Sequence, residues 1–216
     1  MAPTADESGE LVARLKGGDQ QALAELFSRH RQRLWRMVHF RLDPRLHGRV
    51  DADDILQEGY LAAAARIRHF QEDSSTSFFV WLRLVLGQTL IDVHRRHLGV
   101  QMRDAGREIS IHGHFNPQAT SVSLAAQLLG HFTSPSSAAV RDEVAQQLEQ
   151  AVDTMNPIDR EVLALRHFEE LTNSEVAEVL GIKPKAASIR YVRAIGRLKE
   201  ILSRLPGFAE ERDDGG

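Results

Sequence analysis

Apolar residues recur every three or four positions through the first half of the chain. The series between positions 11 and about 98 includes Leu11, Leu15, Leu23, Leu26, Phe27, Leu34, Met37, Val38, Ile55, Leu56 and Leu61. This spacing puts an apolar stripe on one side of a helix, and almost no stretch alternates strictly between apolar and polar residues, as a half-buried strand would. The pattern predicts an all-α fold, with turn-forming residues at 16–19, 42–49 and 71–77 dividing the first half into four helices.

The composition is typical of a globular, water-soluble protein. Hydrophobic residues make up 42% and charged residues 26%, and no apolar run approaches the roughly 18 residues that a membrane-spanning helix needs. A length of 216 residues leaves room for one domain or for two small ones, and we expect two. The chain has no cysteine, which fits a reducing cytosol and excludes disulfides, thiolate zinc sites and thiol nucleophiles. Because the N-terminus shows no basic stretch followed by an apolar core, we expect a cytoplasmic protein with no membrane partner.

Charges are segregated along the chain, although the net charge is only −3. Residues 29–49 hold seven arginines and one acid, whereas residues 51–73 hold six acids and two arginines. Residues 181–199 hold six basic side chains and no acid. Basic stretches suit a nucleic-acid partner and the acidic stretch suits a different one, so the small net charge does not argue against nucleic-acid binding.

A stretch without charged residues separates the two halves. Residues 109–140 contain no Asp, Glu, Lys or Arg but eight Ser or Thr, two Pro and two Gly. This composition predicts a flexible, uncharged linker between a first domain at 10–108 and a second at 141–205. Within the linker, residues 123–129 could form one or two helical turns with Ser123 as the N-cap, but they are too few to form a domain.

A helix-turn-helix is predicted in the second domain. Thr172 and Glu175 form a T-x-x-E capping box that starts a short helix, which ends at Gly181. Two helices can cross closely here because Ala177 is small and Gly181 tolerates the positive φ of a tight turn. A second helix is expected to begin at about residue 184.

The second helix of this motif combines basic and apolar side chains. Its candidate DNA contacts are Lys183, Lys185, Ser188, Arg190 and Arg193. Its expected buried residues are Ala187, Ile189, Val192, Ile195 and Leu198. Basic side chains early in a recognition helix reach base edges and phosphates in the major groove. A solvated basic face is the alternative, but the capping box, the small residue, the turn glycine and the basic helix together favour DNA binding.

Four motifs occur in the order in which one protein family carries them. They are D-x-D-D-I-x-Q-E at 51–58, W-L-R at 81–83, L-I-D-x-x-R-R at 90–96 and the helix-turn-helix. With these motifs, residues 10–108 resemble the second domain, and residues 141–204 the fourth domain, of bacterial sigma factors of the extracytoplasmic-function (ECF) type. The resemblance implies a protein that binds RNA polymerase core and directs it to promoter DNA, without being an enzyme or needing a cofactor. It also allows an anti-sigma protein as a partner.

The resemblance assigns residues to each partner. It implies that the clamp of the largest polymerase subunit contacts Asp53, Asp54, Gln57 and Glu58. It implies minus-ten promoter contacts by Arg83, Arg95, Arg96, Arg103 and Arg107, and minus-thirty-five contacts by the second helix of the helix-turn-helix. Carboxylates near a helix N-terminus are favoured by the helix dipole and complement a basic partner. Without the resemblance, a helix cap and a solvated face would be the simpler explanation of the acidic residues.

Aromatic residues stand just before the minus-ten arginines. Phe78, Phe79 or Trp81 could support an unstacked base of a melted strand. For Trp81 we prefer packing in the core, because the helix around it is apolar on most of its circumference.

Two other classes of function would explain part of the sequence. A helix-turn-helix regulator that binds DNA without polymerase core would explain the second domain but would not need the acidic motif. An enzyme or metal site would have to use the histidines within 94–97 and 111–114, since no Gly-rich phosphate loop or paired nucleophile and base is present. Histidines in a basic stretch or a polar linker are usually solvated, so we predict neither a metal site nor an enzyme.

Overall fold

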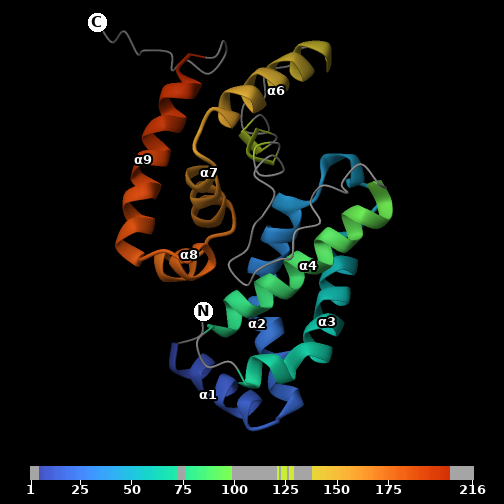
Figure 1. Cartoon of the computed structure of the whole chain (residues 1–216). Coiled ribbons are helices and arrows are strands. Elements are labelled where there is room, and N and C mark those ends of the chain that lie inside the picture. The colour runs from blue at the N-terminus through green and yellow to red at the C-terminus, as the bar shows by residue number, and fades with distance from the viewer. Residues whose placement is uncertain are drawn as a thin grey trace, which may run out of the picture. The chain divides into compact units, whose positions relative to one another are not determined.

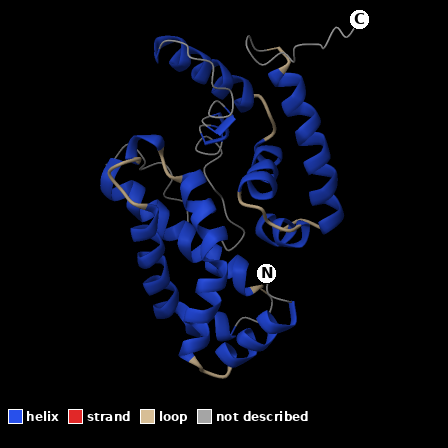
Figure 2. Cartoon of the chain, turned by 180° about the vertical axis from the view of Figure 1, so that it is seen from behind, coloured by secondary structure: helices blue, strands red, loops and turns tan. Residues whose placement is uncertain are grey.

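The computed structural model describes residues 5–72, 76–98, 121, 123–125, 127–128 and 138–204. Within these residues all regular structure is helical and no strand occurs, which confirms the predicted all-α fold (Figures 1 and 2). The chain divides into two compact units, residues 1–113 and 114–216. None of the described helices is long and apolar enough to cross a membrane.

The described part of unit 1 is built from four α-helices and one short 3-10 turn. They are α1 (Ala5–Lys16), α2 (Gln20–Arg41), η1 (Pro44–Leu46), α3 (Ala52–Glu72) and α4 (Phe78–Leu98). Asp19 caps α2, because its Oδ1 accepts a hydrogen bond from the Gln21 N–H at 2.9 Å. Just before α3, Asp51 Oδ1 accepts from the Asp53 N–H, also at 2.9 Å. Local polar contacts therefore determine where these two helices begin.

Helices α3 and α4 approach each other closely at Gly59. A Cβ added to Gly59 would lie 2.3 Å from Cδ1 of Leu86, whose side chain is fully buried. Further along the pair, the ring centroid of Phe70 lies 5.3 Å from that of Phe78 and 5.1 Å from that of Trp81. Phe78 is only 5% exposed and Trp81 is partly buried. Both rings therefore pack within unit 1, as we preferred for Trp81.

Unit 2 contains the helix-turn-helix. Its labelled elements are α6 (Ala138–Asp153), α7 (Pro157–Leu163), the π-helical turn η3 (Ala164–Phe168), α8 (Asn173–Leu180) and α9 (Pro184–Leu202). Glu175 Oε2 accepts from the Thr172 N–H at 2.7 Å, and Thr172 Oγ1 accepts from the Glu175 N–H at 3.3 Å. Gly181 ends α8 with φ of +62°. The capping box and the turn glycine therefore act as predicted, and α9 is the second helix of the motif.

Part of the expected linker is helical and belongs to unit 2. Residues 121, 123–125 and 127–128 are helical, and Ser121 is fully buried. The Ser121 hydroxyl donates to Asp153 Oδ1 at 2.6 Å, and Arg160 donates to the same oxygen at 2.6 Å. Because Ser121 already lies in the helix, the prediction that Ser123 caps it is wrong. The anchoring carboxylate is 32 residues away from Ser121 in the sequence, so the composition of the linker alone could not reveal it. Residues 109–120 lie outside the described residues.

Candidate polymerase and nucleic-acid interfaces

The acidic motif forms an exposed face near the N-terminus of α3. The side chains of Asp53, Asp54, Gln57 and Glu58 are all exposed. The two aspartates lie in the first turn of the helix, where its dipole favours negative charge. Leu61, three residues after Glu58, is 67% exposed, although the apolar series placed it on the buried stripe. The predicted polymerase contacts therefore share one solvent-facing surface that also includes an exposed leucine.

Arginines from two neighbouring helices pair with this acidic face. Arg31 Nη2 of α2 lies 2.8 Å from Asp53 Oδ1, and Arg96 Nη2 of α4 lies 2.5 Å from Glu58 Oε2. About half of each side chain is exposed, so water screens both pairs, and each contributes roughly 0–1 kcal/mol to stability. Among the described residues Asp54 has no ion pair. Sequence reasoning missed both pairs because 22 and 38 residues separate their members.

The minus-ten arginines are placed very differently from one another. Arg83 is 0% exposed, so in this structure its guanidinium is not available to DNA phosphates, and we leave it out of the proposed minus-ten contacts. Its burial follows from its position on α4, which is buried on most of its circumference between Phe78 and His94. Arg95 is exposed and lies 3.8 Å from Asp92, one turn earlier. Arg103 and Arg107 lie outside the described residues.

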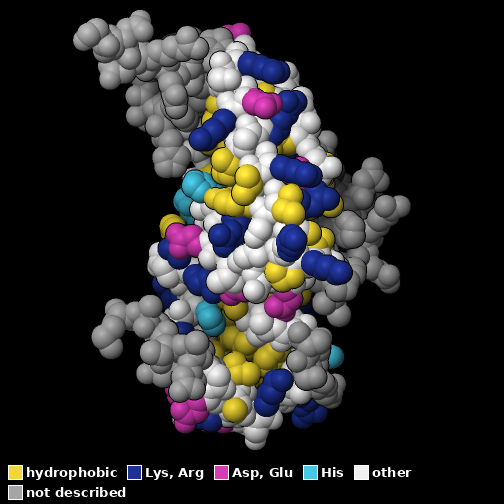
Figure 3. Space-filling model, turned by 90° about the vertical axis from the view of Figure 1, so that its left-hand side faces the viewer, with side chains coloured by type: hydrophobic (Ala, Val, Ile, Leu, Met, Phe, Trp, Pro, Cys, Tyr) yellow, Lys and Arg dark blue, Asp and Glu magenta, His cyan; other side chains and the backbone are white. Residues whose placement is uncertain are grey.

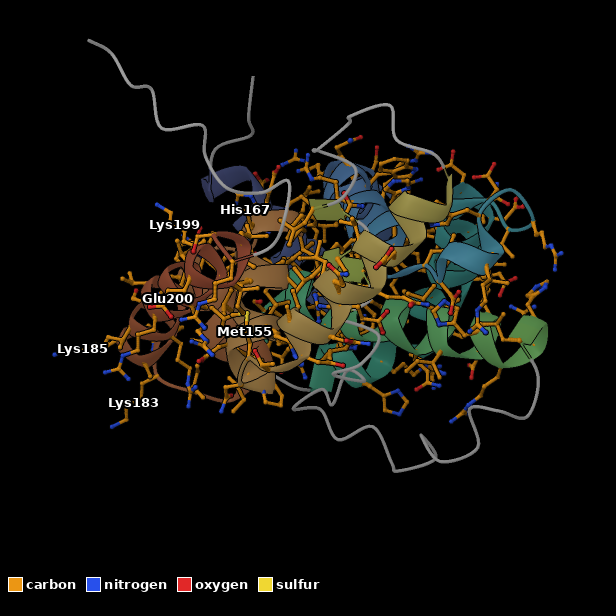
Figure 4. All side chains as sticks on the ribbon, turned by 90° about the horizontal axis from the view of Figure 1, so that it is seen from above. Met155, His167, Lys183, Lys185, Lys199 and Glu200 are labelled. Carbon is orange, nitrogen blue, oxygen red and sulfur yellow. The ribbon has the colours of Figure 1, made fainter. Side chains whose placement is uncertain are left out.

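The basic residues of α9 are mostly exposed. Lys183 precedes the helix as its N-cap residue, and Lys183 and Lys185 point outward from its start (Figure 4). Ser188 and Arg193 are also exposed. Arg190 differs, because its Nη1 lies 2.8 Å from Asp159 Oδ1 of α7 and about two thirds of its side chain is covered.

Apolar residues of α9 do not all face the core. Ile189 is 44% exposed and Val192 is 71% exposed, so the prediction that they are buried is wrong. The buried residues are instead Ala187, Ala194 and Ile201, seven positions apart. The partly buried Tyr191, Ile195 and Leu198 pack beside the last two. Alanines let α9 approach α7 closely on that side, which turns the two larger β-branched residues to solvent.

The exposed face of α9 is therefore mixed in character. Figure 3 faces the side of the chain on which α9 lies and shows Lys and Arg side chains interspersed with hydrophobic ones. The regular spacing of Ala187 and Ala194 is the sequence signal that could have identified the true buried side.

The histidines of 94–97 do not share a site. His94 is 8% exposed, and its Nε2 accepts a hydrogen bond from the Asp43 N–H at 3.2 Å. Burial lowers the pKa of His94, an effect that the nearby Asp43 carboxylate partly opposes. His97 is exposed. No group of three or more potential metal ligands is found among the described residues, which exclude 111–114.

Comparisons with known proteins agree on one family. The sequence model of the ECF sigma factor family matches residues 6–200. The RNA polymerase sigma factor NccH of Alcaligenes xylosoxydans xylosoxydans is 30% identical over 206 residues, covering 93% of this chain and 96% of the relative. The ECF RNA polymerase sigma factor SigW of Bacillus subtilis is 24% identical over 195 residues, covering 90% and 96%.

A solved structure shares the fold. The structure of CnrH in complex with the cytosolic domain of CnrY has a TM-score of 0.50 at 23% identity and covers 89% of this chain and 95% of that one. The family match extends over nearly the whole chain, including both units and the region between them. The protein therefore belongs to the ECF sigma factor family, whose members bind RNA polymerase core and direct transcription initiation.

Proposed function

We propose that this sigma factor binds polymerase core and the minus-ten region through unit 1 and the minus-thirty-five region through unit 2. The acidic face of α3, made of Asp53, Asp54, Gln57 and Glu58, binds the clamp of the largest polymerase subunit. Arg95, Arg96, Arg103 and Arg107 contact the minus-ten region. The exposed face of α9, with Lys183, Lys185, Ser188 and Arg193, contacts the minus-thirty-five region. One observation carries the proposal: the exposed acidic face and the exposed basic face lie on different units.

The ion pairs of α3 suit a surface that exchanges partners. Arg31 and Arg96 neutralise Asp53 and Glu58 in the isolated chain through half-exposed contacts. Such pairs cost little to break, so arginines or lysines of a partner protein could replace them. Asp54 is exposed and has no ion pair among the described residues, so its carboxylate is directly available to a basic side chain of the partner.

Asp54→Lys is the sharpest test of this surface. Reversing Asp53 would also repel Arg31 within the chain, whereas Asp54 has no ion pair to lose among the described residues. We expect Asp54→Lys to abolish co-purification with core polymerase while the helical circular dichroism spectrum is unchanged. Glu10→Lys is the matched control, since Glu10 is also exposed on unit 1, makes no ion pair among the described residues, and undergoes the same charge change. Normal core binding by Asp54→Lys, or equal loss in both variants, would exclude the proposed surface.

Arg190 has a different role from its neighbours on α9. Its guanidinium holds α9 to α7 through Asp159, so we assign it to positioning the helix as well as to DNA attraction. Arg193 is exposed and makes no ion pair among the described residues, which leaves its charge available to a phosphate.

The competing function is a regulator that binds DNA alone. It is distinguished by measuring promoter-specific DNA binding with and without core polymerase. We expect specific binding and transcript initiation to need core. Equally tight and specific binding by the purified chain alone would favour the regulator instead.

Three further properties belong to the same proposal. We place the protein in the cytoplasm, where its polymerase partner works. We infer that it acts by recruitment and carries out no catalysis of its own. We also infer an anti-sigma partner from the family, which co-purification of the tagged chain from its native cells would test.

A further inference from the structure

Two exposed aliphatic side chains interrupt the basic face of α9. Ile189 and Val192 are 44% and 71% exposed, the only two large hydrophobic residues of α9 with exposure of this degree among the described residues. They are three residues apart and so are neighbours on one side of the helix. Lys185 lies one turn before Ile189, and Arg193 one turn after it. The aliphatic pair therefore sits within the basic surface proposed to face DNA.

Folding does not account for these two residues. They are not part of the core cluster of unit 2, which the other side of α9 completes with Ala194 and Ile201. Both are β-branched, and such residues have a lower helix propensity than alanine or lysine at an exposed position. Their presence therefore adds to the solvent-exposed apolar surface without a benefit to α9 itself.

An apolar group in a major groove has one specific partner among the bases. The C5-methyl of thymine is the only apolar group that a base pair presents there, and aliphatic side chains recognise it by contact. Basic neighbours hold a recognition helix in the groove through phosphates but carry little sequence information themselves. The first turns of such a helix are the ones that reach base edges, and Ile189 and Val192 lie in the second and third turns of α9.

We propose that Ile189 and Val192 read thymine methyl groups in the minus-thirty-five element. This inference rests on the proposed role of α9. It makes the two residues determinants of promoter sequence, whereas Lys185 and Arg193 supply mainly sequence-independent affinity.

Replacing thymine by deoxyuridine tests the proposal, because it removes only the methyl group. The probe is the minus-thirty-five duplex that the full-length chain with core polymerase selects from a random-sequence pool. Each thymine of this duplex is replaced in turn, and the dissociation constant is measured at fixed salt. We expect at least one replacement to weaken binding by about fourfold, the value of one buried methyl group. Ile189→Ala or Val192→Ala should remove the sensitivity at that position.

Two controls make the result specific. Ile158→Ala changes an isoleucine of α7 that is 40% exposed, and it should keep the full sensitivity to thymine replacement. Arg193→Ala should weaken binding to the thymine and deoxyuridine duplexes by the same factor. Since the changed side chains are exposed, all variants should keep the helical content and melting temperature of the wild type.

The outcomes distinguish failure of the thymine-methyl contact from failure of the proposed role of α9 in minus-thirty-five binding. If the wild type binds the fully substituted duplex as tightly as the thymine duplex, or if the alanine variants keep the wild-type sensitivity, the methyl contact is overturned while the role of α9 stands. A selected duplex without thymine in the protected segment would overturn it in the same way. Failure of the wild type to select any duplex would overturn the role of α9 as well.

Discussion

Replacing Gly59 with alanine probes how α3 is held against α4. The added Cβ would lie 2.3 Å from Leu86 Cδ1, whereas carbon atoms pack at about 3.5–4.0 Å. Leu86 is fully buried, and its Cγ and Cβ also lie within 4 Å of the added atom, so moving the methyl away displaces core atoms. Overpacking of this kind costs about 1–3 kcal/mol, and the better helix propensity of alanine offsets roughly 0.5–1 kcal/mol. We expect Gly59→Ala to lower the free energy of unfolding of unit 1 by about 1–2 kcal/mol.

A second glycine provides the matched control for this substitution. Gly196 also lies inside a helix, but nothing is found within 4 Å of its added Cβ, so Gly196→Ala should stabilise unit 2 by roughly 0.5–1 kcal/mol. Both tryptophans, Trp35 and Trp81, lie in unit 1, so their fluorescence during urea unfolding follows the unit that contains Gly59. Circular dichroism follows both units. If Gly59→Ala stabilises the protein as Gly196→Ala does, the close approach of α3 and α4 is refuted.

Three further predictions concern charge and helix capping. Arg193→Ala should reduce the slope of log DNA affinity against log salt concentration by about 1. Arg190→Ala should reduce this slope less, because Asp159 already neutralises the Arg190 charge, and equal reductions would contradict the Arg190–Asp159 ion pair. Burial lowers the pKa of His94 in the folded chain, so as the pH falls the unfolded chain binds a proton at this imidazole before the folded chain does. The free energy of unfolding should therefore have its full value above about pH 6.5 and decrease as the pH falls below it. His94→Gln should show a shallower decrease in denaturant titrations between pH 7 and 5, and an identical pH profile would exclude His94 as a cause. Thr172→Ala, which removes half of the capping box, should lower the free energy of unfolding by about 1 kcal/mol, and an unchanged urea midpoint would contradict the role of the cap.

The starts and ends of helices were largely predictable because their causes are local. Asp19 caps α2 through an amide only two residues away, and Thr172 and Glu175 cap α8 within four residues. Gly181 supplies the positive φ of the turn. Each of these contacts is visible as a short residue pattern, so the helix-turn-helix could be placed before any packing was known.

The buried or exposed state of single residues was less predictable because it depends on distant partners. Arg83 occurs in a motif that suggested DNA contact, yet α4 turns it into unit 1. Ile189 and Val192 are as hydrophobic as core residues, yet the close packing of Ala194 with Leu163 and Met155 turns them outward. Hydrophobicity alone does not specify which side of a helix its neighbours will cover.

By itself, the sequence determined the helical class, the capped helix-turn-helix, the acidic motif and the family, because these depend on residue types at short spacings. Tertiary structure alone decided that Arg31 and Arg96 pair with the acidic face and that Asp153 anchors the helical part of the linker. It also decided which side of α9 is exposed to solvent. These outcomes require residues separated by tens of positions to meet in space. Their contact energies depend on packing that no local pattern contains.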